Sequence, residues 1–304
     1  MEVWTIQKLL NWVAEYLKSK GVDSPRLSAE LLLSYVLGLK RIELYTQFNK
    51  VVAQESLSRL HELVRRAGTH EPIAYLTGRC EFYSIEFEIT RDCLIPRPET
   101  ELLVERAIEF LRTRDGRQPA VSLVEGPNPY VCDLCTGCGC VAIAIARNFA
   151  NCRIVATDIS DVALAVAERN ISGHGLGGRI QLLQGDLFEP IIPGLGPAKF
   201  DLIVCNPPYV SEPEFEKLDR NVRDFEPKIA LTAGHDGLDV IKRIIATAGE
   251  FLKPAAALML EIGNEQGPAV RTLLEDTGRF ATVNIEKDYN NLDRLAVAIR
   301  KSAG

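Results

Sequence analysis

The feature that most constrains this chain is a regular alternation of short apolar runs with longer helical patterns after residue 130. Strands are predicted at Tyr130–Leu134, Arg153–Asp158, Arg179–Gln184, Phe200–Cys205 and Ala256–Ile262. Helices are predicted at Cys140–Asn148, Ser160–Ser172, Asp239–Leu252 and Gln266–Glu275. Such alternation predicts a mostly parallel sheet with helices on both faces. Two strands in succession at the end, Ala281–Glu286 and Leu295–Arg300, predict an antiparallel edge.

The first part of the chain follows a helical period instead, with apolar residues at Leu9, Trp12, Val13, Tyr16 and Leu17. Ser24-Pro25 predicts an N-cap residue followed by proline in the first helical turn. Apolar and acidic residues alternate in Glu81–Thr90, which is typical of a half-exposed strand or hairpin. We therefore expect a helical domain at 1–78, a β-hairpin connector at 79–97 and an α/β domain at 98–304.

Composition and charge limit the classes of function. The chain has 304 residues, of which 46% are hydrophobic and 25% charged, as in ordinary globular proteins. No apolar run approaches the roughly 20 residues that span a bilayer, and no signal peptide pattern opens the sequence. We therefore expect a cytoplasmic protein without membrane contact. The net charge of -6 disfavours a clamp on nucleic acid. Residues 1–85 carry 11 Lys and Arg against 9 Asp and Glu, which favours a protein-binding module.

Four of the eight cysteines lie close together, at Cys132, Cys135, Cys138 and Cys140. The first three have the C-x2-C-x2-C spacing of some iron–sulfur proteins. However, Cys140 follows after one residue rather than three, and no proline comes after it. We interpret these cysteines as small, reduced, buried residues and predict no metal site.

The segment Val131–Gly139 leads from a predicted strand through a turn into a helix. Gly137 and Gly139 permit positive φ angles and close approach of a ligand, and the helix start offers free N–H groups. Asp158 ends the next strand, where a carboxylate can accept ribose hydroxyls. The loop also fits the G-x-G-x-x-A pattern of NAD-binding proteins. By itself it therefore leaves NAD and S-adenosylmethionine both open.

The segment Asn206-Pro207-Pro208-Tyr209 directly follows the predicted strand Phe200–Cys205. Two consecutive prolines end the strand and fix the backbone. The Asn206 side-chain oxygen and the Pro207 carbonyl can then accept both N–H bonds of an NH2 group, and the Tyr209 ring can cover that planar group. Because a dehydrogenase has no need of this arrangement, it favours S-adenosylmethionine and a planar amide or amine nitrogen as methyl acceptor.

Further motifs occur along the chain together with this corner. They are Tyr75-Leu76-Thr77-Gly78, Glu81-Phe82, Leu94-Ile95-Pro96-Arg97-Pro98-Glu99-Thr100-Glu101, Gln184-Gly185-Asp186, Glu226-Pro227, Ala230-Leu231, Gly237-Leu238-Asp239, Glu261-Ile262-Gly263, Asp288 and Asp293-Arg294. These motifs follow one another as in the bacterial peptide chain release factor glutamine methyltransferases, the HemK/PrmC family. The chain resembles that family from about residue 24 onward.

The resemblance implies a class I S-adenosylmethionine methyltransferase: a Rossmann-like, mostly parallel seven-stranded sheet with an antiparallel edge, plus a small helical N-terminal domain. It implies cofactor contacts from Cys135, Thr136, Gly137, Cys138, Gly139, Asp158, Asp186, Leu187 and Asn206. Substrate contacts are expected from Leu94, Asn206, Pro207, Pro208 and Tyr209, of which Asn206, Pro207 and Tyr209 are expected to be catalytic.

The substrate implied by the resemblance is the glutamine of the Gly-Gly-Gln motif in release factors 1 and 2, modified by a monomeric enzyme without direct contact to nucleic acid. A binding-only protein without turnover is disfavoured by Asn206, Tyr209 and Asp158, although Cys135 leaves it open. Two alternative methyltransferase functions also remain. One is a glutamine methyltransferase of a ribosomal protein, and the other is an adenine-N6 methyltransferase, which would have to flip its base out of the stack.

One departure concerns the cofactor loop, where the family pattern is Asp-Leu-Gly-Thr-Gly-Ser-Gly. This chain has Cys135 in place of the first glycine and Cys138 in place of the serine. A Cβ at Cys135 restricts φ and crowds the methionine end of the cofactor. We expect activity to survive with weaker cofactor binding.

Overall fold

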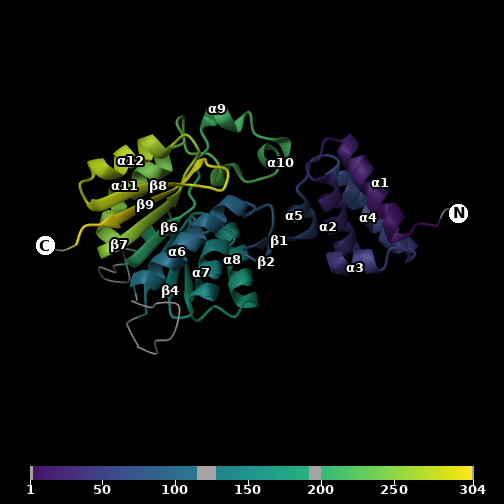
Figure 1. Cartoon of the computed structure of the whole chain (residues 1–304), viewed down its shortest axis with the longest axis horizontal. Coiled ribbons are helices and arrows are strands. Elements are labelled where there is room, and N and C mark those ends of the chain that lie inside the picture. Colours follow the sequence, from purple (N-terminus) through teal and green to yellow (C-terminus); the bar gives the residue numbers. More distant parts are fainter. Residues whose placement is uncertain (1–2, 115–127, 192–199, 303–304) are drawn as a thin grey trace. The chain divides into compact units, whose positions relative to one another are not determined.

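The computed structural model describes residues 3–114, 128–191 and 200–302 (Figure 1). The chain forms two compact units. The first joins Met1–Arg79 with Leu218–Glu226, and the second joins Cys80–Lys217 with Pro227–Gly304. The sequence did not predict that Leu218–Glu226 belongs with the N-terminal helices. Among the described residues, no helix is long and apolar enough to span a membrane.

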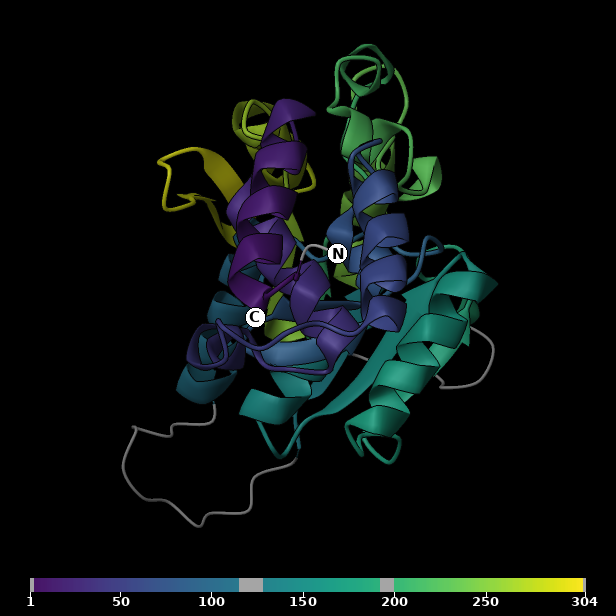
Figure 2. The ribbon, with the colours of Figure 1, turned by 90° about the vertical axis from the view of Figure 1, so that its right-hand side faces the viewer.

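Five N-terminal helices of the first unit share one apolar core (Figures 1 and 2). They are α1 (Ile6–Ser19), α2 (Pro25–Leu37), α3 (Arg41–Thr46), α4 (Gln54–Ala67) and α5 (Ile73–Thr77). Ser24 occupies the N-cap position of α2 and Pro25 begins the helix, as predicted, although the Ser24 side chain makes no capping hydrogen bond. Ser24 has φ 45° and ψ 53°, whereas a capping residue needs an extended backbone to aim its oxygen at the helix.

A hairpin opens the second unit, with β1 (Arg79–Phe82) and β2 (Ile85–Glu88). Phe82, Ile85 and Phe87 are buried and the intervening glutamates exposed, which confirms the predicted alternation. Tyr83 and Ser84 both have positive φ angles, the conformation that joins twisted strands through a two-residue turn. The chain then enters the short helix η1 (Pro98–Thr100) and continues as α6 (Glu101–Arg114).

The seven-stranded sheet confirms the predicted Rossmann-like architecture. Its strands are β3 (Tyr130–Leu134), β4 (Arg153–Asp158), β5 (Ile180–Gln184), β6 (Phe200–Cys205), β7 (Leu252–Glu261), β8 (Phe280–Lys287) and β9 (Asp293–Arg300). They lie in the order β5-β4-β3-β6-β7-β9-β8. The pairs from β5 to β7 are parallel, and β9 is antiparallel to both of its neighbours. The antiparallel strand therefore lies inside the edge, because β8 takes the outer position and β9 folds back beside β7 (Figure 1).

Helices cover both faces of the sheet because its central strands β3 and β6 are buried on both sides. On one face, α11 (Asp239–Phe251) and α12 (Gly267–Asp276) share a core with alternate residues of β3, β6 and β7. The connecting helices α7 (Cys140–Asn148) and α8 (Asp161–Gly173) follow β3 and β4. Two short helices, α9 (Glu212–Phe215) and α10 (Arg220–Arg223), and two 3-10 turns, η2 (Glu189–Ile191) and η3 (Lys228–Ala230), complete the connections.

The strand order reverses at β3, which has β4 on one side and β6 on the other. Ligands in open α/β sheets bind beyond the carboxyl ends of the strands at this switch point. Leu134 at the end of β3 is paired in register with Cys205 at the end of β6. The segments that begin at Cys135 and Asn206 therefore leave the sheet side by side.

Candidate active site

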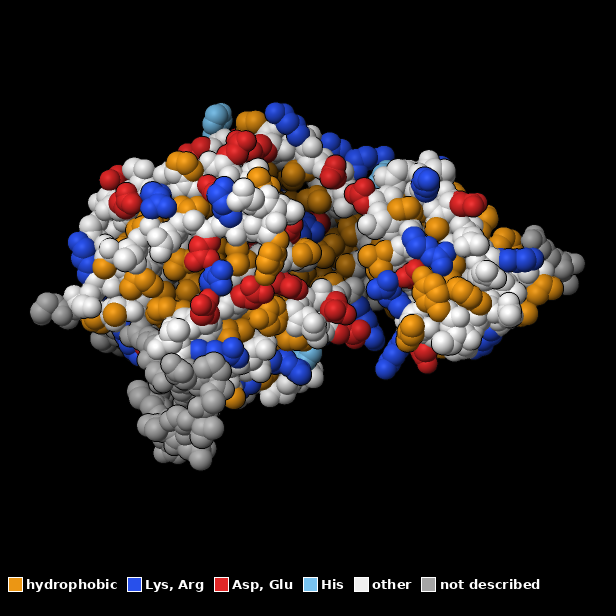
Figure 3. Space-filling view, viewed as in Figure 1, with side chains coloured by type: hydrophobic (Ala, Val, Ile, Leu, Met, Phe, Trp, Pro, Cys, Tyr) orange, Lys and Arg blue, Asp and Glu red, His pale blue; other side chains and the backbone are white. Residues whose placement is uncertain are grey.

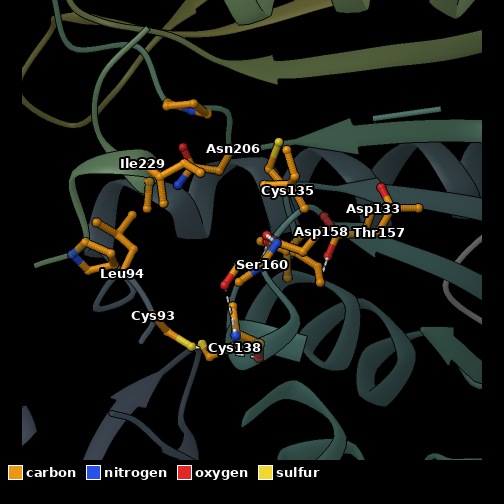
Figure 4. Close-up of a pocket in the computed structure, with 18 of the residues that line it drawn as sticks. Cys93, Leu94, Asp133, Cys135, Cys138, Thr157, Asp158, Ser160, Asn206 and Ile229 are labelled. Atoms are coloured by element: carbon orange, nitrogen blue, oxygen red, sulfur yellow. Dashed lines mark hydrogen bonds between the residues drawn. The ribbon is translucent and has the colours of Figure 1, made fainter. Parts of the chain in front are cut away.

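A cavity of about 220 Å³ lies at the switch point. It extends past both segments, with Leu94, Ile229 and Asn206 on one side and Thr157 and Asp158 on the other (Figure 4). Ten of the predicted site residues line it: Leu94, Cys135, Thr136, Gly137, Cys138, Asp158, Asp186, Leu187, Asn206 and Pro208. Gly139, Pro207 and Tyr209 are not among the lining residues of the described chain. Gly139 instead occupies the N-cap position of α7.

The cofactor loop depends on two glycines with left-handed backbone, Gly137 with φ 56° and Gly139 with φ 83°. The Gly137 N–H donates to Asp158 Oδ2 at 2.8 Å, and the Ser160 N–H donates to Asp158 Oδ1 at 2.9 Å. Burial raises the pKa of Asp158, and these backbone donors act in the opposite direction. Each carboxylate oxygen keeps a further lone pair for a hydroxyl donor. Asp158 thus fastens the loop and remains able to accept ribose hydroxyls.

Asp133 is a buried carboxyl group beneath this loop that sequence reasoning did not single out. It lines the cavity and accepts a hydrogen bond from Thr136 Oγ1 at 2.6 Å. Burial raises its pKa to about 7, although Thr136 and the Ala142 N–H oppose that shift. An acidic residue within the apolar strand β3 was the signal that could have identified it.

Cys135 takes a left-handed conformation, with φ 55°. For a residue with a Cβ, such a conformation costs on the order of 1–3 kcal/mol. Its side chain lines the cavity and packs against the core beneath it, where its thiol interacts with that of Cys205. The loop therefore keeps the backbone conformation that a glycine would adopt.

The second replaced position, Cys138, faces a different group of residues. Its thiol lies beside Cys93, which is buried and has a raised pKa because of that burial (Figure 4). The Cys138 carbonyl accepts a hydrogen bond from Asn170 Nδ2 at 2.9 Å. Asn170 also exchanges two hydrogen bonds with the backbone of Glu88 in β2, so it joins the loop to the hairpin.

Asp186 and Leu187 line the cavity beyond Asp158. Asp186 Oδ2 forms an ion pair with Arg243 Nη2 at 2.7 Å, and Arg243 lines the cavity too. Arg243 is a site residue that the sequence did not reveal, because it belongs to the exposed part of α11 and to none of the motifs.

The acceptor corner, Asn206–Tyr209, is held by contacts from several elements. Asn206 Nδ2 donates to Thr100 Oγ1 at 3.1 Å. The Tyr209 hydroxyl donates to Glu261 Oε1 at 3.1 Å, and its ring packs against the core that α11 and α12 share. The Tyr209 carbonyl accepts from Gln266 Nε2 at 2.9 Å. A Cβ at Gly237 would lie 2.3 Å from the same carbonyl, so only glycine fits there.

Two site residues at this corner were missed by sequence reasoning, Thr100 and Glu261. Both lie within motifs that carry the family resemblance, but no local pattern places either of them at the acceptor corner. The predicted contact of the Tyr209 ring with the acceptor stays a prediction, as does the role of the Pro207 carbonyl. In the structure Pro207 is buried, and Tyr209 is directed toward Glu261.

Three features together define a Rossmann-like methyltransferase. They are a parallel sheet whose strand order reverses at β3 and which has one antiparallel strand, a glycine loop after β3, and an adjoining polar corner after β6. Solved structures support this fold. The hMettl16 catalytic domain in complex with MAT2A 3'UTR hairpin 1 is similar, with a TM-score of 0.55 at 16% identity over 83% of each chain.

Comparison with known sequences defines the family. The PrmC N-terminal domain model matches residues 8–78, and the methyltransferase small domain model matches residues 121–221. The release factor glutamine methyltransferase of Rhodopirellula baltica is 40% identical over 293 residues, covering 96% of this chain and 95% of that protein. The enzyme of the same name from Geobacter sulfurreducens is 40% identical over 294 residues, covering 97% and 96%. This chain belongs to the release factor glutamine methyltransferase family.

Proposed function

We propose that this protein transfers a methyl group from S-adenosylmethionine to the side-chain amide nitrogen of the glutamine in the Gly-Gly-Gln motif of release factors 1 and 2. One observation carries the proposal: a single cavity joins the glycine loop and Asp158 to the Asn206 corner. Family membership supports the choice of substrate. We further expect the protein to act as a cytoplasmic monomer.

The lining residues suit each part of this cofactor. Asp158 has lone pairs for the ribose hydroxyls, and Asp186 with Leu187 lies where the adenine would bind. The turn at Cys135–Gly137 borders the methionine end, next to the buried Asp133. When bound, S-adenosylmethionine supplies an electrophilic methyl group on a sulfonium. The ionised Asp133 carboxylate would favour that positive charge.

The acceptor corner suits a primary amide. An amide nitrogen is a poor nucleophile because its lone pair is delocalised, so catalysis relies on placement and on polarising the N–H bonds. Asn206 and the Pro207 carbonyl are proposed to accept those two bonds. Leu94 and Pro208 would border the glutamine side chain. The proton leaves the nitrogen for water after the methyl group has been transferred.

Surface charge is the observation that separates this proposal from a nucleic-acid methyltransferase. On the face shown in Figure 3, acidic and basic side chains are interspersed, and the chain carries a net charge of -6. An enzyme that extrudes a base has to bind phosphates along its substrate. A protein substrate fits this charge distribution better.

The test is incubation of the purified protein with methyl-labelled S-adenosylmethionine and purified release factor 1 or 2, followed by mass spectrometry of the modified peptide. We expect one methyl group on the Gly-Gly-Gln glutamine. No label should enter a factor in which that glutamine is replaced by alanine, nor appear with the Asn206→Ala enzyme. Label on ribosomal protein or on nucleic acid, with an unmodified release factor, would reject the proposal.

A further inference from the structure

A buried polar cluster lies beneath the acceptor corner and is not explained by packing alone. Thr100 and Glu261 are each 1% exposed. Thr100 is the last residue of η1, and Glu261 ends β7, so neither is near Asn206 in sequence. Unpaired polar groups are costly in such surroundings. Their retention under a reactive corner points to a function for their hydrogen bonds.

The contacts form a continuous path from Asn206 to Glu261. Asn206 Nδ2 donates to Thr100 Oγ1 at 3.1 Å, and the Tyr209 hydroxyl donates to Glu261 Oε1 at 3.1 Å. The Thr100 hydroxyl also interacts with the Glu261 carboxyl group, and this interaction opposes the increase in the Glu261 pKa that burial causes. Glu261 Oε2 has no partner in hydrogen-bond geometry within the described residues. Glu261 Oε2 can therefore still accept a hydrogen bond.

The inventory of hydrogens along this path fixes the orientation of the Asn206 amide. A carboxylate only accepts hydrogen bonds, and a hydroxyl group has one hydrogen to donate. With Glu261 ionised, the Thr100 hydrogen is directed to the Glu261 carboxylate, which leaves Thr100 Oγ1 to accept from an N–H group. Only the NH2 end of Asn206 can satisfy it. With Nδ2 held on Thr100, Oδ1 is the end of the amide left for the acceptor group in the cavity.

The opposite orientation of the amide would be unproductive. It would direct the two N–H bonds of Asn206 toward the N–H bonds of the substrate, so that donors face donors. It would also leave Thr100 Oγ1 without its donor in a buried site, at a cost of about 1–3 kcal/mol. The buried pair therefore selects the form of Asn206 that can polarise a substrate amide.

The surroundings of Glu261 act on its pKa in opposite directions, and the effect of burial is the larger one. Burial raises its pKa, whereas Thr100, Tyr209 and Arg294 lower it. Arg294 is itself bound to Asp288 through Nε at 3.2 Å. Its charge therefore acts on Glu261 from a distance and does not occupy Oε1, which accepts from the Tyr209 hydroxyl group.

We propose that Thr100 and Glu261 are positioning residues, which set the Asn206 side chain as a hydrogen-bond acceptor and fasten Tyr209 at the same corner. The inference rests on the proposed function, because it assigns the oriented amide to catalysis. This role requires no contact between either residue and the ribose or adenine of the cofactor.

The test uses three variants of the full-length protein with release factor as substrate. Thr100→Val keeps the shape and removes the hydroxyl group, and Thr100→Ser is the matched control that retains it. Glu261→Gln places an N–H donor where two hydroxyl groups need acceptors. We expect Thr100→Val and Glu261→Gln to lower kcat at least tenfold, while KM for the factor and the Kd for S-adenosylmethionine stay within threefold. Thr100→Ser should retain kcat within threefold.

A second measurement follows the geometry without turnover. The side-chain amide hydrogens of Asn206, observed by 15N NMR, should exchange slowly in the wild-type protein and in Thr100→Ser and faster in Thr100→Val. Absence of wild-type methylation rejects the proposed function. By contrast, normal wild-type methylation with unchanged kcat in Thr100→Val, equal losses in the valine and serine variants, or unchanged amide exchange in Thr100→Val each overturns this inference.

Discussion

The cofactor loop after β3 and the acceptor corner after β6 directly follow paired residues of neighbouring strands. The two segments nevertheless take their shapes from different interactions. The turn takes its shape from backbone conformation, with three left-handed residues at Cys135, Gly137 and Gly139. The corner takes its shape from two prolines and from side chains that reach it from distant elements. One segment is therefore shaped mainly by local backbone conformation, whereas the other is shaped mainly by tertiary side-chain contacts.

This difference explains where the chain can depart from its family pattern. A replacement in the turn is tolerated when the new residue can adopt the required φ, as Cys135 does at φ 55°. The corner depends on the identity of side chains, because each of Asn206 and Tyr209 satisfies a particular buried partner. We therefore expect side-chain changes at the corner to affect kcat and changes at the turn to affect cofactor binding.

The largest effect is expected at the corner. Asn206→Ala should lower kcat by about a hundredfold or more, because it removes an acceptor used in the transition state. The Kd for S-adenosylmethionine, measured by calorimetry, should remain within a few-fold of the wild-type value. A parallel loss of cofactor affinity would show that Asn206 belongs functionally to the cofactor site and would remove the proposed contrast.

At Asp158 we expect the opposite pattern, a larger effect on cofactor binding than on kcat. Asp158→Ala removes the ribose acceptor and also the anchor of the Gly137 N–H. The Kd for the cofactor should rise roughly tenfold or more, while kcat at saturating cofactor should fall much less. The measurement is a calorimetric titration beside steady-state kinetics. A kcat loss as large as that of Asn206→Ala, with unchanged Kd, would contradict the assignment.

A pH effect is expected beneath the turn. Burial raises the pKa of Asp133 to about 7, so the folded protein binds a proton that the unfolded chain has released. From about pH 4 to about pH 7 this group therefore lowers the free energy of unfolding as pH rises, by at most about 1.4 kcal/mol per pH unit. Denaturant unfolding at several pH values should show this contribution, and Asp133→Asn should remove it. An identical slope in the variant would exclude Asp133 as its source.

The smallest effect is expected at Cys135. Cys135→Gly removes the cost of a left-handed backbone on a residue with a Cβ and opens space beside the methionine end. The cofactor Kd should fall about two- to fivefold with little change in kcat. Cys138→Ser is the control, since its backbone requires no such relief, and its Kd should not change. Unchanged or weaker binding by Cys135→Gly would reject the crowding explanation.

Much of the fold followed from sequence because its signals are local. The bounds of β3, β4, β6 and α7 agree with the prediction residue for residue, since glycine, proline and charged residues mark the ends of their apolar runs. The N-cap position of Ser24 also followed from sequence, but its missing capping hydrogen bond did not, because the left-handed backbone at that residue cannot be anticipated from its identity. The place of β9 inside the sheet edge also depended on pairing between distant segments.

The sequence alone determined the parallel sheet, the glycine loop, Asp158 and the proline-fixed corner, because each depends on residues that are neighbours in the chain. Only the tertiary structure decided that Thr100 and Glu261 lie beneath Asn206 and that Arg243 pairs with Asp186. These contacts join residues of different strands and helices, so they exist only once the sheet order has brought those elements together. The orientation of a side-chain amide is a property of that assembled neighbourhood.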